Sequence, residues 1–238
     1  MKIRKISDPV MRNFKLRLCH ASDTHGTFPL LHGRYNVVVH TGDFFPNSQH
    51  CLLSDKSKEM KFQLQWLRDS LDDIRQWLNG HTLIYVPGNH DFLHPDTIEY
   101  ELQRVGIEAY GITNRLFTHQ GITFYGFPYV PTIDGTWNYE KDLPEMQIEA
   151  DKMAEKLNKT KVDVLCCHSA IYGCMDLSYG NEVLGSTVIA NALDYKIDKD
   201  MLPEYFLHGH LHEAAGISIR NGILVSNAAT TYNIIEIS

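Results

Sequence analysis

Histidine, aspartate and asparagine residues gather at the ends of five short apolar runs in this 238-residue sequence. Asp23 and His25 follow the first run, and Asp43 follows the second. The other members of the group are Asn89, His90, Asp91, His168, His210 and His212. In open α/β sheets the carboxyl ends of the strands face one crevice, so we expect these side chains to converge.

The donor atoms of this group indicate a site for two metal ions. Oxygen and imidazole donors in this number exceed what one tetrahedral zinc ion requires. An aspartate shared between two divalent cations, about 3.5–4 Å apart, is the arrangement that clamps an in-line displacement at phosphorus. Asp43, which follows Gly42 in an expected tight turn, is the candidate bridge. The mixed nitrogen and oxygen set suits Mn²⁺, the ion we expect, and also Fe, Zn or Co.

The runs that carry these residues have the features of buried strands. They are short, rich in β-branched residues and bounded by Gly, Pro or Asp, and they cover residues 16–22, 37–43, 82–91, 162–169 and 204–212. Helical periodicity predicts helices over residues 56–78, 97–105, 145–157 and 182–193. Residues 116–127 and 215–237 are expected to form hairpins or meanders of a second sheet.

This alternation predicts a single α/β domain over residues 1–238, because a length prior of roughly 150 residues per domain does not force a division. We expect a four-layer α/β/β/α sandwich, with two mixed sheets flanked by helices and the dimetal site at the carboxyl ends of the strands. Residues 1–14 are expected to be a loose N-terminal extension, with translation starting at Met1 or Met11.

The net charge and the cysteines indicate which binding partners and which cellular compartment to expect. The net charge of -7 argues against electrostatic binding of nucleic acid or an anionic membrane over a broad surface. Five cysteines without ligand-pair spacing fit reduced thiols in a cytoplasmic protein, and the adjacent Cys166 and Cys167 are interpreted as buried and inert. No apolar run has the length of a signal-peptide core or a transmembrane helix.

Five motifs together resemble those of the calcineurin-like metallophosphoesterase superfamily. In chain order they are D-T-H at 23–25, G-D at 42–43, G-N-H-D at 88–91, a single histidine at 168 and G-H-L-H at 209–212. Residues 126–137, 208–216 and 226–229 are similar to the small phosphodiesterase subgroup typified by the brain metallophosphoesterase-domain-containing proteins. Ala170 departs from the pattern, since many relatives have proline there.

The resemblance implies a division of the ligands between two ions. The first ion would take Asp23, His25, Asp43 and His212, and the second Asp43, Asn89, His168 and His210. A metal-bridging hydroxide would attack a small phosphodiester such as a cyclic nucleotide. His90 would stay free of metal and act as general acid. Asp91 is expected to hydrogen-bond the His90 imidazole.

Other interpretations stay open. The same centre could serve a phosphomonoesterase or a nuclease, and a fold of this type without catalysis could serve as a binding scaffold. The expected partners are a small phosphoester substrate and a second copy of the chain in a homodimer; neither a membrane nor strong nucleic-acid binding is expected. The aromatic residues Tyr125, Phe127, Tyr129, Trp137 and Tyr139 could stack a nucleobase or pack in the core.

Overall fold

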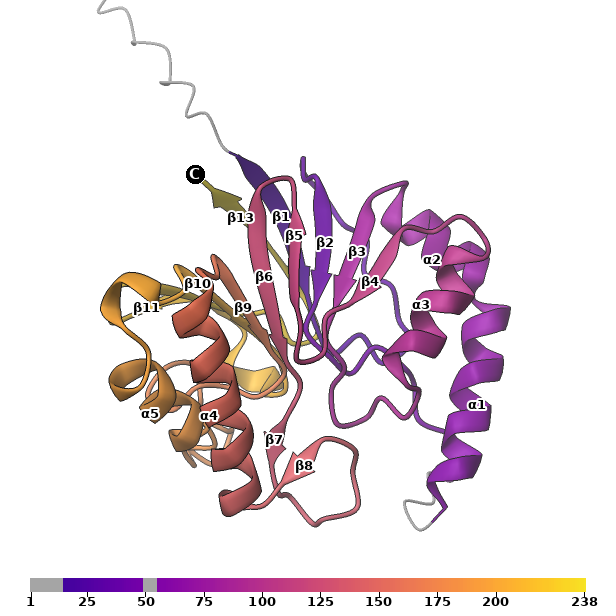
Figure 1. Ribbon diagram of the computed structural model, residues 1–238. Helices are drawn as coiled ribbons and strands as arrows, with labels where there is room; N and C mark the ends of the chain where they lie inside the picture. The colour runs from indigo at the N-terminus through magenta and orange to yellow at the C-terminus, as the bar shows by residue number, and fades with distance from the viewer. Residues whose placement is uncertain (1–14, 49–54) are drawn as a thin grey trace, which may run out of the picture.

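The computed structural model describes residues 15–48 and 55–238 (Figure 1). The predicted N-terminal extension and Cys51 lie outside the described residues. The described chain forms two large sheets that lie side by side between two groups of helices (Figure 1). The prediction of two mixed sheets flanked by helices is therefore confirmed.

The first sheet has the strand order β13-β1-β2-β3-β4. Its strands are β1 (Leu16–Ala21), β2 (Val37–His40), β3 (Thr82–Tyr85), β4 (Ala109–Gly111) and β13 (Tyr232–Ile237). Strands β1 to β4 run parallel, whereas β13 pairs antiparallel with β1. The expectation that residues 215–237 lie wholly in the second sheet is thus wrong for β13, which closes the edge of the first sheet along the whole length of β1.

The second sheet has the order β11-β12-β10-β9-β6-β5. Its strands are β5 (Leu116–His119), β6 (Ile122–Phe127), β9 (Val164–Cys167), β10 (Tyr205–His208), β11 (Gly216–Arg220) and β12 (Ile223–Asn227). The four inner strands are parallel. The outer strands are antiparallel to their neighbours, and each forms a hairpin with one of them: β5 with β6, and β11 with β12. A short pair, β7 (Val130–Pro131) and β8 (Glu140–Lys141), stands apart from both sheets.

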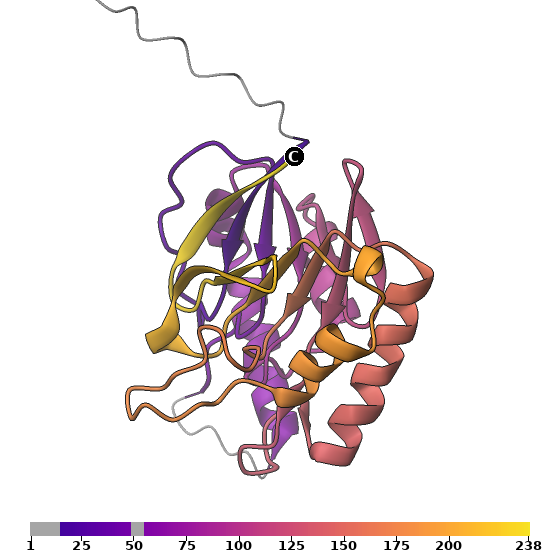
Figure 2. The same ribbon diagram turned by 90° about the vertical axis from the view of Figure 1, so that its left-hand side faces the viewer.

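Helices cover the outer face of each sheet. The first group is α1 (Lys56–Asp69), α2 (Leu71–Leu78) and α3 (Pro95–Gln103), and the second is α4 (Leu143–Lys159) and α5 (Thr187–Tyr195). Figure 2 views the molecule from the side of α4 and α5, with α1 behind the sheets. Two 3-10 turns, η1 (Lys199–Met201) and η2 (His212–Ala214), complete the described elements. None of the described helices is both long and apolar enough to cross a bilayer.

All four predicted helices are present with shifted bounds, and two of the differences lie at a serine. The predicted helix 56–78 is two helices divided at Ser70, whose backbone leaves helical geometry at φ -98° and ψ 6°. The predicted helix 182–193 begins only at Thr187, because the hydroxyl of Ser186 accepts a hydrogen bond from the Ile189 amide and caps the helix there.

Strand alternation divides the buried apolar side chains among three layers. Val37 and Val39 of β2 point into the core between the sheets, whereas Val38 points toward the helices of the first sheet. In β9, Cys166 faces the core between the sheets and Cys167 faces α4 and α5. Both thiols are buried and unpaired, as predicted. Because both faces of these strands are buried, their sequences read as continuous apolar runs.

Candidate metal centre

The seven predicted ligands lie beyond the carboxyl ends of five strands, three in the first sheet and two in the second. Together with His90, these residues form three groups, and the ligand atoms within each group lie within 4.8 Å of one another. The groups are Asp23, His25 and His212; His25, Asp43 and His90; and Asp43, His168 and His210. Asp43 belongs to two of these groups, which is the position a bridging carboxylate needs. Asn89 adjoins the last group, because its Oδ1 lies 3.0 Å from Nε2 of His168.

The backbone turns sharply at the ligands that follow β1, β2 and β10. Four of them have positive φ although none is glycine: Asp23 (53°), His25 (44°), Asp43 (55°) and His210 (69°). A positive φ is uncommon for such residues and is concentrated at functional sites in proteins. These turns come directly after the strand ends, where the ligand residues lie.

Two glycines are required by close approach to the carboxylates. A Cβ at Gly88 would lie 2.2 Å from Oδ1 of Asp43, and a Cβ at Gly209 would lie 2.1 Å from Oδ2 of Asp23. Backbone amides use the space that the missing side chains leave. The His90 amide donates to Asp43 Oδ1 over 2.8 Å, and the His210 amide donates to Asp23 Oδ2 over 2.9 Å.

His168 is held in the orientation of a metal-binding imidazole. Its Nδ1 lies 2.8 Å from the carbonyl oxygen of Thr41, so Nδ1 carries the proton. Nε2 then remains as the nitrogen that faces Asp43, 3.3 Å from its Oδ2. Ligating histidines commonly donate their second ring N–H to a carbonyl in this way. An imidazole nitrogen that follows a strand of the second sheet therefore lies beside the Asp43 carboxylate, which follows a strand of the first sheet.

Opposite charges are paired in this cluster. Burial alone would raise the pKa of Asp43, but the charge and hydrogen bond of His168 hold it below its ordinary value. Burial lowers the pKa of His168, and the carboxylates of Asp43 and Asp23 more than offset this, raising it to about 10. A cation that binds here must displace the imidazolium proton, as metal binding to histidine requires.

A family model described as calcineurin-like phosphoesterase matches residues 16–214. The chain belongs to the calcineurin-like phosphoesterase family. It is therefore a metallophosphoesterase, as the motifs indicated. A UPF0046 protein of Caenorhabditis elegans is 23% identical over 249 residues, covering 96% of this chain and 80% of the relative. A second UPF0046 protein of the same organism is 32% identical over 96 residues, which are 40% of this chain and 22% of the relative.

Solved structures show the same fold at low sequence identity. One crystal structure superposes with a TM-score of 0.67 at 14% identity, covering 93% of this chain and 99% of the other. A Thermus thermophilus protein superposes with a TM-score of 0.59 at 10% identity, covering 93% of this chain and 98% of the other. Together with the family match, these similarities confirm the predicted fold class.

The donor set fits the two divalent cations that the calcineurin-like phosphoesterase family implies. Two carboxylates, one amide oxygen and four imidazoles come together, and the imidazole of His168 is already oriented by its second nitrogen. Carboxylates reduce the charge of a metal pair while neutral imidazoles set its geometry. The assignment of each residue to one ion stays a prediction. A ring nitrogen of His90 also lies within 4.8 Å of the ligand atoms of His25 and Asp43.

The predicted hydrogen bond between the His90 ring and Asp91 is wrong. The Asp91 carboxylate accepts instead from three backbone amides, those of Phe44 (2.9 Å), Phe45 (3.1 Å) and Gly88 (2.8 Å). Burial, together with the charge of Asp43, raises the pKa of Asp91 to about 7. Asp91 therefore braces the turns after β2 and β3, and its side chain points away from the ring it was expected to orient.

The aromatic segment 125–139 divides between core and site. Tyr125 and Phe127 are fully buried in the core beneath α4 and α5. Trp137 lies at the site, with its ring centroid 4.0 Å from that of His90 and an interplanar angle of 36°. Tyr125 and Phe127 thus take the core role that sequence reasoning left open, whereas Trp137 packs against His90; nucleobase stacking stays a prediction.

Three further histidines support the site from beneath. His20 bridges the two sheets, because its ring nitrogens lie 2.8 Å from Ser226 Oγ and 2.9 Å from Thr41 Oγ1. His40 contacts Thr24 Oγ1 through Nε2 at 3.1 Å. Burial lowers the pKa of His40 to about 3 and that of His208 to about 4, so both rings stay neutral. His20 and His40 therefore have structural roles; sequence reasoning missed the role of His20.

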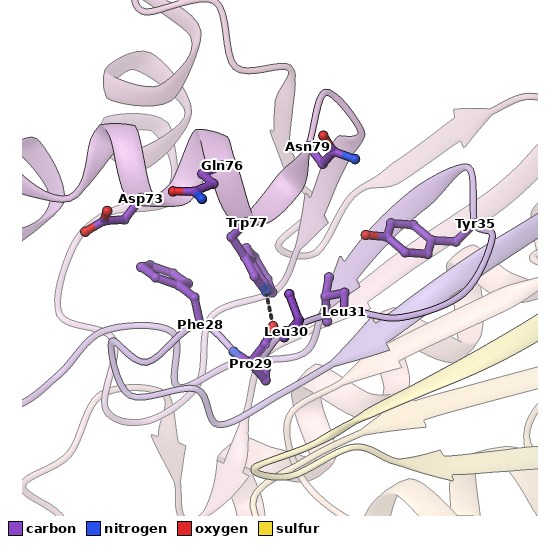
Figure 3. A pocket seen from close by; sticks show the side chains of 9 residues that line it. All are labelled: Phe28, Pro29, Leu30, Leu31, Tyr35, Asp73, Gln76, Trp77 and Asn79. Carbon is purple, nitrogen blue, oxygen red and sulfur yellow. Dashed lines mark hydrogen bonds between the residues drawn. The ribbon is translucent and has the colours of Figure 1, made fainter.

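Two clefts share Phe28 and Pro29, which belong to the segment that follows Asp23 and His25. The larger, of about 500 Å³, lies between α2 and residues 28–35, where the indole of Trp77 donates to the Pro29 carbonyl over 3.0 Å (Figure 3). No predicted ligand lines it. The smaller, of about 300 Å³, is lined by Asp23 and His25 and shares Phe28 and Pro29 with the larger. The smaller cleft is the one that adjoins the metal centre.

Proposed function

We propose that this metallophosphoesterase hydrolyses small phosphodiesters, with cyclic nucleotides as the first candidates. The observation that carries the proposal is the place of Asp43 in two groups of ligand atoms, with donors from both sheets around it. Such a paired site suits displacement at phosphorus. The similarity of residues 126–137 and 208–216 to the small phosphodiesterase subgroup supports the choice of a diester.

Each part of the chemistry has a residue in place. Two divalent cations, when bound, supply Lewis-acid charge to the phosphoryl oxygens and lower the pKa of water. Asp43 would hold both ions, and Asn89 would complete one site without adding negative charge. His90 is placed to protonate the oxygen of the leaving group, and Asp91 fixes the backbone of the turn that carries it.

The charge around the site favours a diester over a monoester. A monoester brings nearly two negative charges, and proteins commonly meet such phosphates with arginine or lysine. Neither residue type lines the cleft beside Asp23 and His25, whose other described walls are Thr24, Thr27, Phe28, Pro29 and Thr230. A diester with a single negative charge needs less cationic support, so it fits this lining better.

The size of the cleft and the charge of the chain favour a small substrate. About 300 Å³ lies at the lower end of the volumes of small-molecule sites. A net charge of -7 opposes a nuclease that must hold a long polyanion. A scaffold without catalysis would not need the complete set of donors.

Metal, compartment and assembly complete the proposal. Mn²⁺ is the ion we propose, since a mixed nitrogen and oxygen set suits it. The four described cysteines are unpaired, which supports a reducing compartment and hence the cytoplasm. We also propose that the chain assembles as a homodimer.

The experiment is a comparison of substrates in the presence of Mn²⁺. Hydrolysis is measured for bis-p-nitrophenyl phosphate, p-nitrophenyl phosphate, and 2′,3′-cyclic and 3′,5′-cyclic nucleotides. The diesters should give the higher kcat/KM, and a chelator should abolish their turnover.

The matched control is His168→Ala, which removes one predicted ligand from the second sheet. It should lose turnover of all four substrates together. A higher kcat/KM for the monoester would overturn the diesterase proposal. Absence of hydrolysis for every substrate in the metal-loaded wild type would favour the scaffold.

A further inference from the structure

The ring of His90 is held from two directions by residues outside the metal centre. The side-chain nitrogen Nδ2 of Asn47 lies 2.7 Å from Nδ1 of His90. The indole of Trp137 lies against the ring, with centroids 4.0 Å apart. Asn47 follows β2 and Trp137 lies between β7 and β8, so two separate segments converge on one imidazole.

The contact with Asn47 determines which ring nitrogen is available to a substrate. Nδ1 is engaged by the amide, and no described residue hydrogen-bonds to Nε2. Oδ1 of Asn47 is buried without a partner among the described residues. Because an amide is a donor on one side and an acceptor on the other, turning it over lets Asn47 hold Nδ1 whether or not Nδ1 carries a proton.

The backbone beneath the ring is anchored separately. The Gln63 side chain of α1 donates to the His90 carbonyl over 2.7 Å and accepts from the Phe92 amide over 2.7 Å. The ring itself can therefore move only by rotation of its own side chain. Asn47 and Trp137 are the two contacts from outside the metal centre that restrict this rotation.

Trp137 is fixed by its own set of contacts. Glu140 accepts the Trp137 amide over 3.1 Å, and Lys56 of α1 donates to the Trp137 carbonyl over 3.1 Å. Asn138 donates from its side chain to the Asp91 carbonyl over 2.9 Å, which joins this segment to the turn that carries His90. These contacts fix the backbone from which the indole extends toward His90.

We propose that Asn47 and Trp137 are positioning residues for His90, which keep its Nε2 directed at the leaving group of the substrate. This proposal rests on the proposed function. Water forms the new bond to phosphorus and gives up a proton to solvent, while the bond to the leaving oxygen breaks with its electron pair on that oxygen, which takes a proton from Nε2 of His90. The ring keeps its other proton on Nδ1, where Oδ1 of Asn47 accepts it.

The kinetic test uses substrates that differ in their need for a proton. Asn47→Ala and Trp137→Ala should lower kcat on a cyclic nucleotide, whose alkoxide leaves poorly, by about 10–100-fold with little change in KM, a part of the effect of a general acid. On bis-p-nitrophenyl phosphate the loss should be smaller, because p-nitrophenolate departs without help. Asn47→Asp and Trp137→Phe should recover most of the lost kcat, since they keep the acceptor and the aromatic face.

The control is Ser48→Ala, which alters the neighbouring position but not the contact with His90, because Ser48 bonds to Glu59. It should leave kcat on both substrates unchanged. Metal content is measured for each variant, so that lost metal is not mistaken for a displaced ring. Equal losses on both substrates in Asn47→Ala would overturn the positioning role.

A spectroscopic measurement tests the contact without turnover. Histidine-selective ¹⁵N NMR of the full chain loaded with Zn²⁺ should show His90 ring nitrogens with one fixed hydrogen-bonded state. In Asn47→Ala the two nitrogens should move toward averaged values, whereas Ser48→Ala should leave them in place. Unchanged His90 signals in Asn47→Ala would overturn the proposal. If the wild type hydrolyses none of the substrates, the proposed function fails, and the ring signals still decide whether Asn47 holds His90.

Discussion

At the scale of single residues, Asp43 is the residue whose carboxylate contacts ligands from both sheets. Its carboxylate lies 3.3 Å from His168 Nε2 and 3.8 Å from His25 Nε2, and it also accepts the amide of His90. It does so from a left-handed backbone conformation, φ 55°, that few residue types tolerate. Asparagine is one of those types. The charge at this position can therefore be removed without changing the turn.

We predict that Asp43→Asn loses both metal ions while the fold persists. A supporting residue typically contributes about 10–100-fold to metal affinity, and a shared ligand should contribute more. The measurement is elemental analysis of the purified variant beside its circular dichroism spectrum. Asp23→Asn is the matched control and should retain one ion, because Asp23 belongs to a single group of ligand atoms. Two tightly held ions in Asp43→Asn would disprove the bridge.

Residue types and their order were sufficient to predict which residues come together beyond the strand ends, but not the direction of every side chain. His20 lies two positions after Leu18 on β1 and shares its orientation toward the second sheet, so strand alternation could have indicated its place. Asn47 lies in a loop after Pro46, where no periodicity directs the side chain. Asp91 was misjudged because adjacency to His90 in sequence was taken for adjacency in space.

At the scale of elements, the apolar runs predicted every strand that carries a ligand, since strands buried on both faces leave a continuous signal. The strand β13 was assigned to the wrong sheet, because local pattern does not encode which distant strand it pairs with. The breaks at Ser70 and Ser186 depend on backbone geometry and on a capping hydroxyl. Such boundaries are the least predictable feature of a helix.

One ion pair joins a helix to an edge strand across 26 positions of sequence. Arg220 of β11 donates to both carboxylate oxygens of Asp194 in α5, over 2.8 and 2.7 Å, and both side chains are less than a quarter exposed. The guanidinium holds the pKa of Asp194 below its ordinary value. A lowered carboxyl pKa stabilises the fold fully above the ordinary value and ceases to do so as the pH falls through the lowered one.

We predict that Asp194→Asn lowers the free energy of unfolding at pH 7 by about 1–3 kcal/mol, the range for a hydrogen bond to a charged group. Urea titrations of the variant and the wild type at pH 7 and at a strongly acidic pH should show this difference shrinking at the lower pH, as the wild-type carboxyl becomes protonated through its lowered pKa. A double-mutant cycle with Arg220→Gln isolates the pair. An equal difference at both pH values would contradict the assignment.

At the scale of the whole molecule, the metal centre lies where the two sheets meet. Asp23, His25, Asp43 and Asn89 follow strands of the first sheet, and His168, His210 and His212 follow strands of the second. The sheets also share one buried apolar core, so neither can unfold without exposing the other. Ions bound by this set would connect both halves of the fold, and the unfolded chain would not present the same site.

Removal of the metal should therefore destabilise the entire domain. A ligand that binds only the folded state at about 100 times its Kd adds about 2.7 kcal/mol. For a chain of this size that corresponds to a decrease in Tm of about 5–10 °C on chelation. Differential scanning calorimetry of Mn²⁺-loaded and EDTA-treated protein measures it, and a single transition should shift as a whole.

Two variants distinguish the metal centre from a nonspecific effect of cations. Asp43→Asn should show little difference in Tm between the loaded and chelated states, because the ligand shared by the two sheets has lost its charge. Asp73→Asn removes a carboxylate from the cleft of Figure 3, away from the centre, and should keep the full difference. If Asp73→Asn lost the difference and Asp43→Asn kept it, the stabilising cation would bind in that cleft. Two separate transitions after chelation would show that the ions, rather than the apolar core, hold the sheets together.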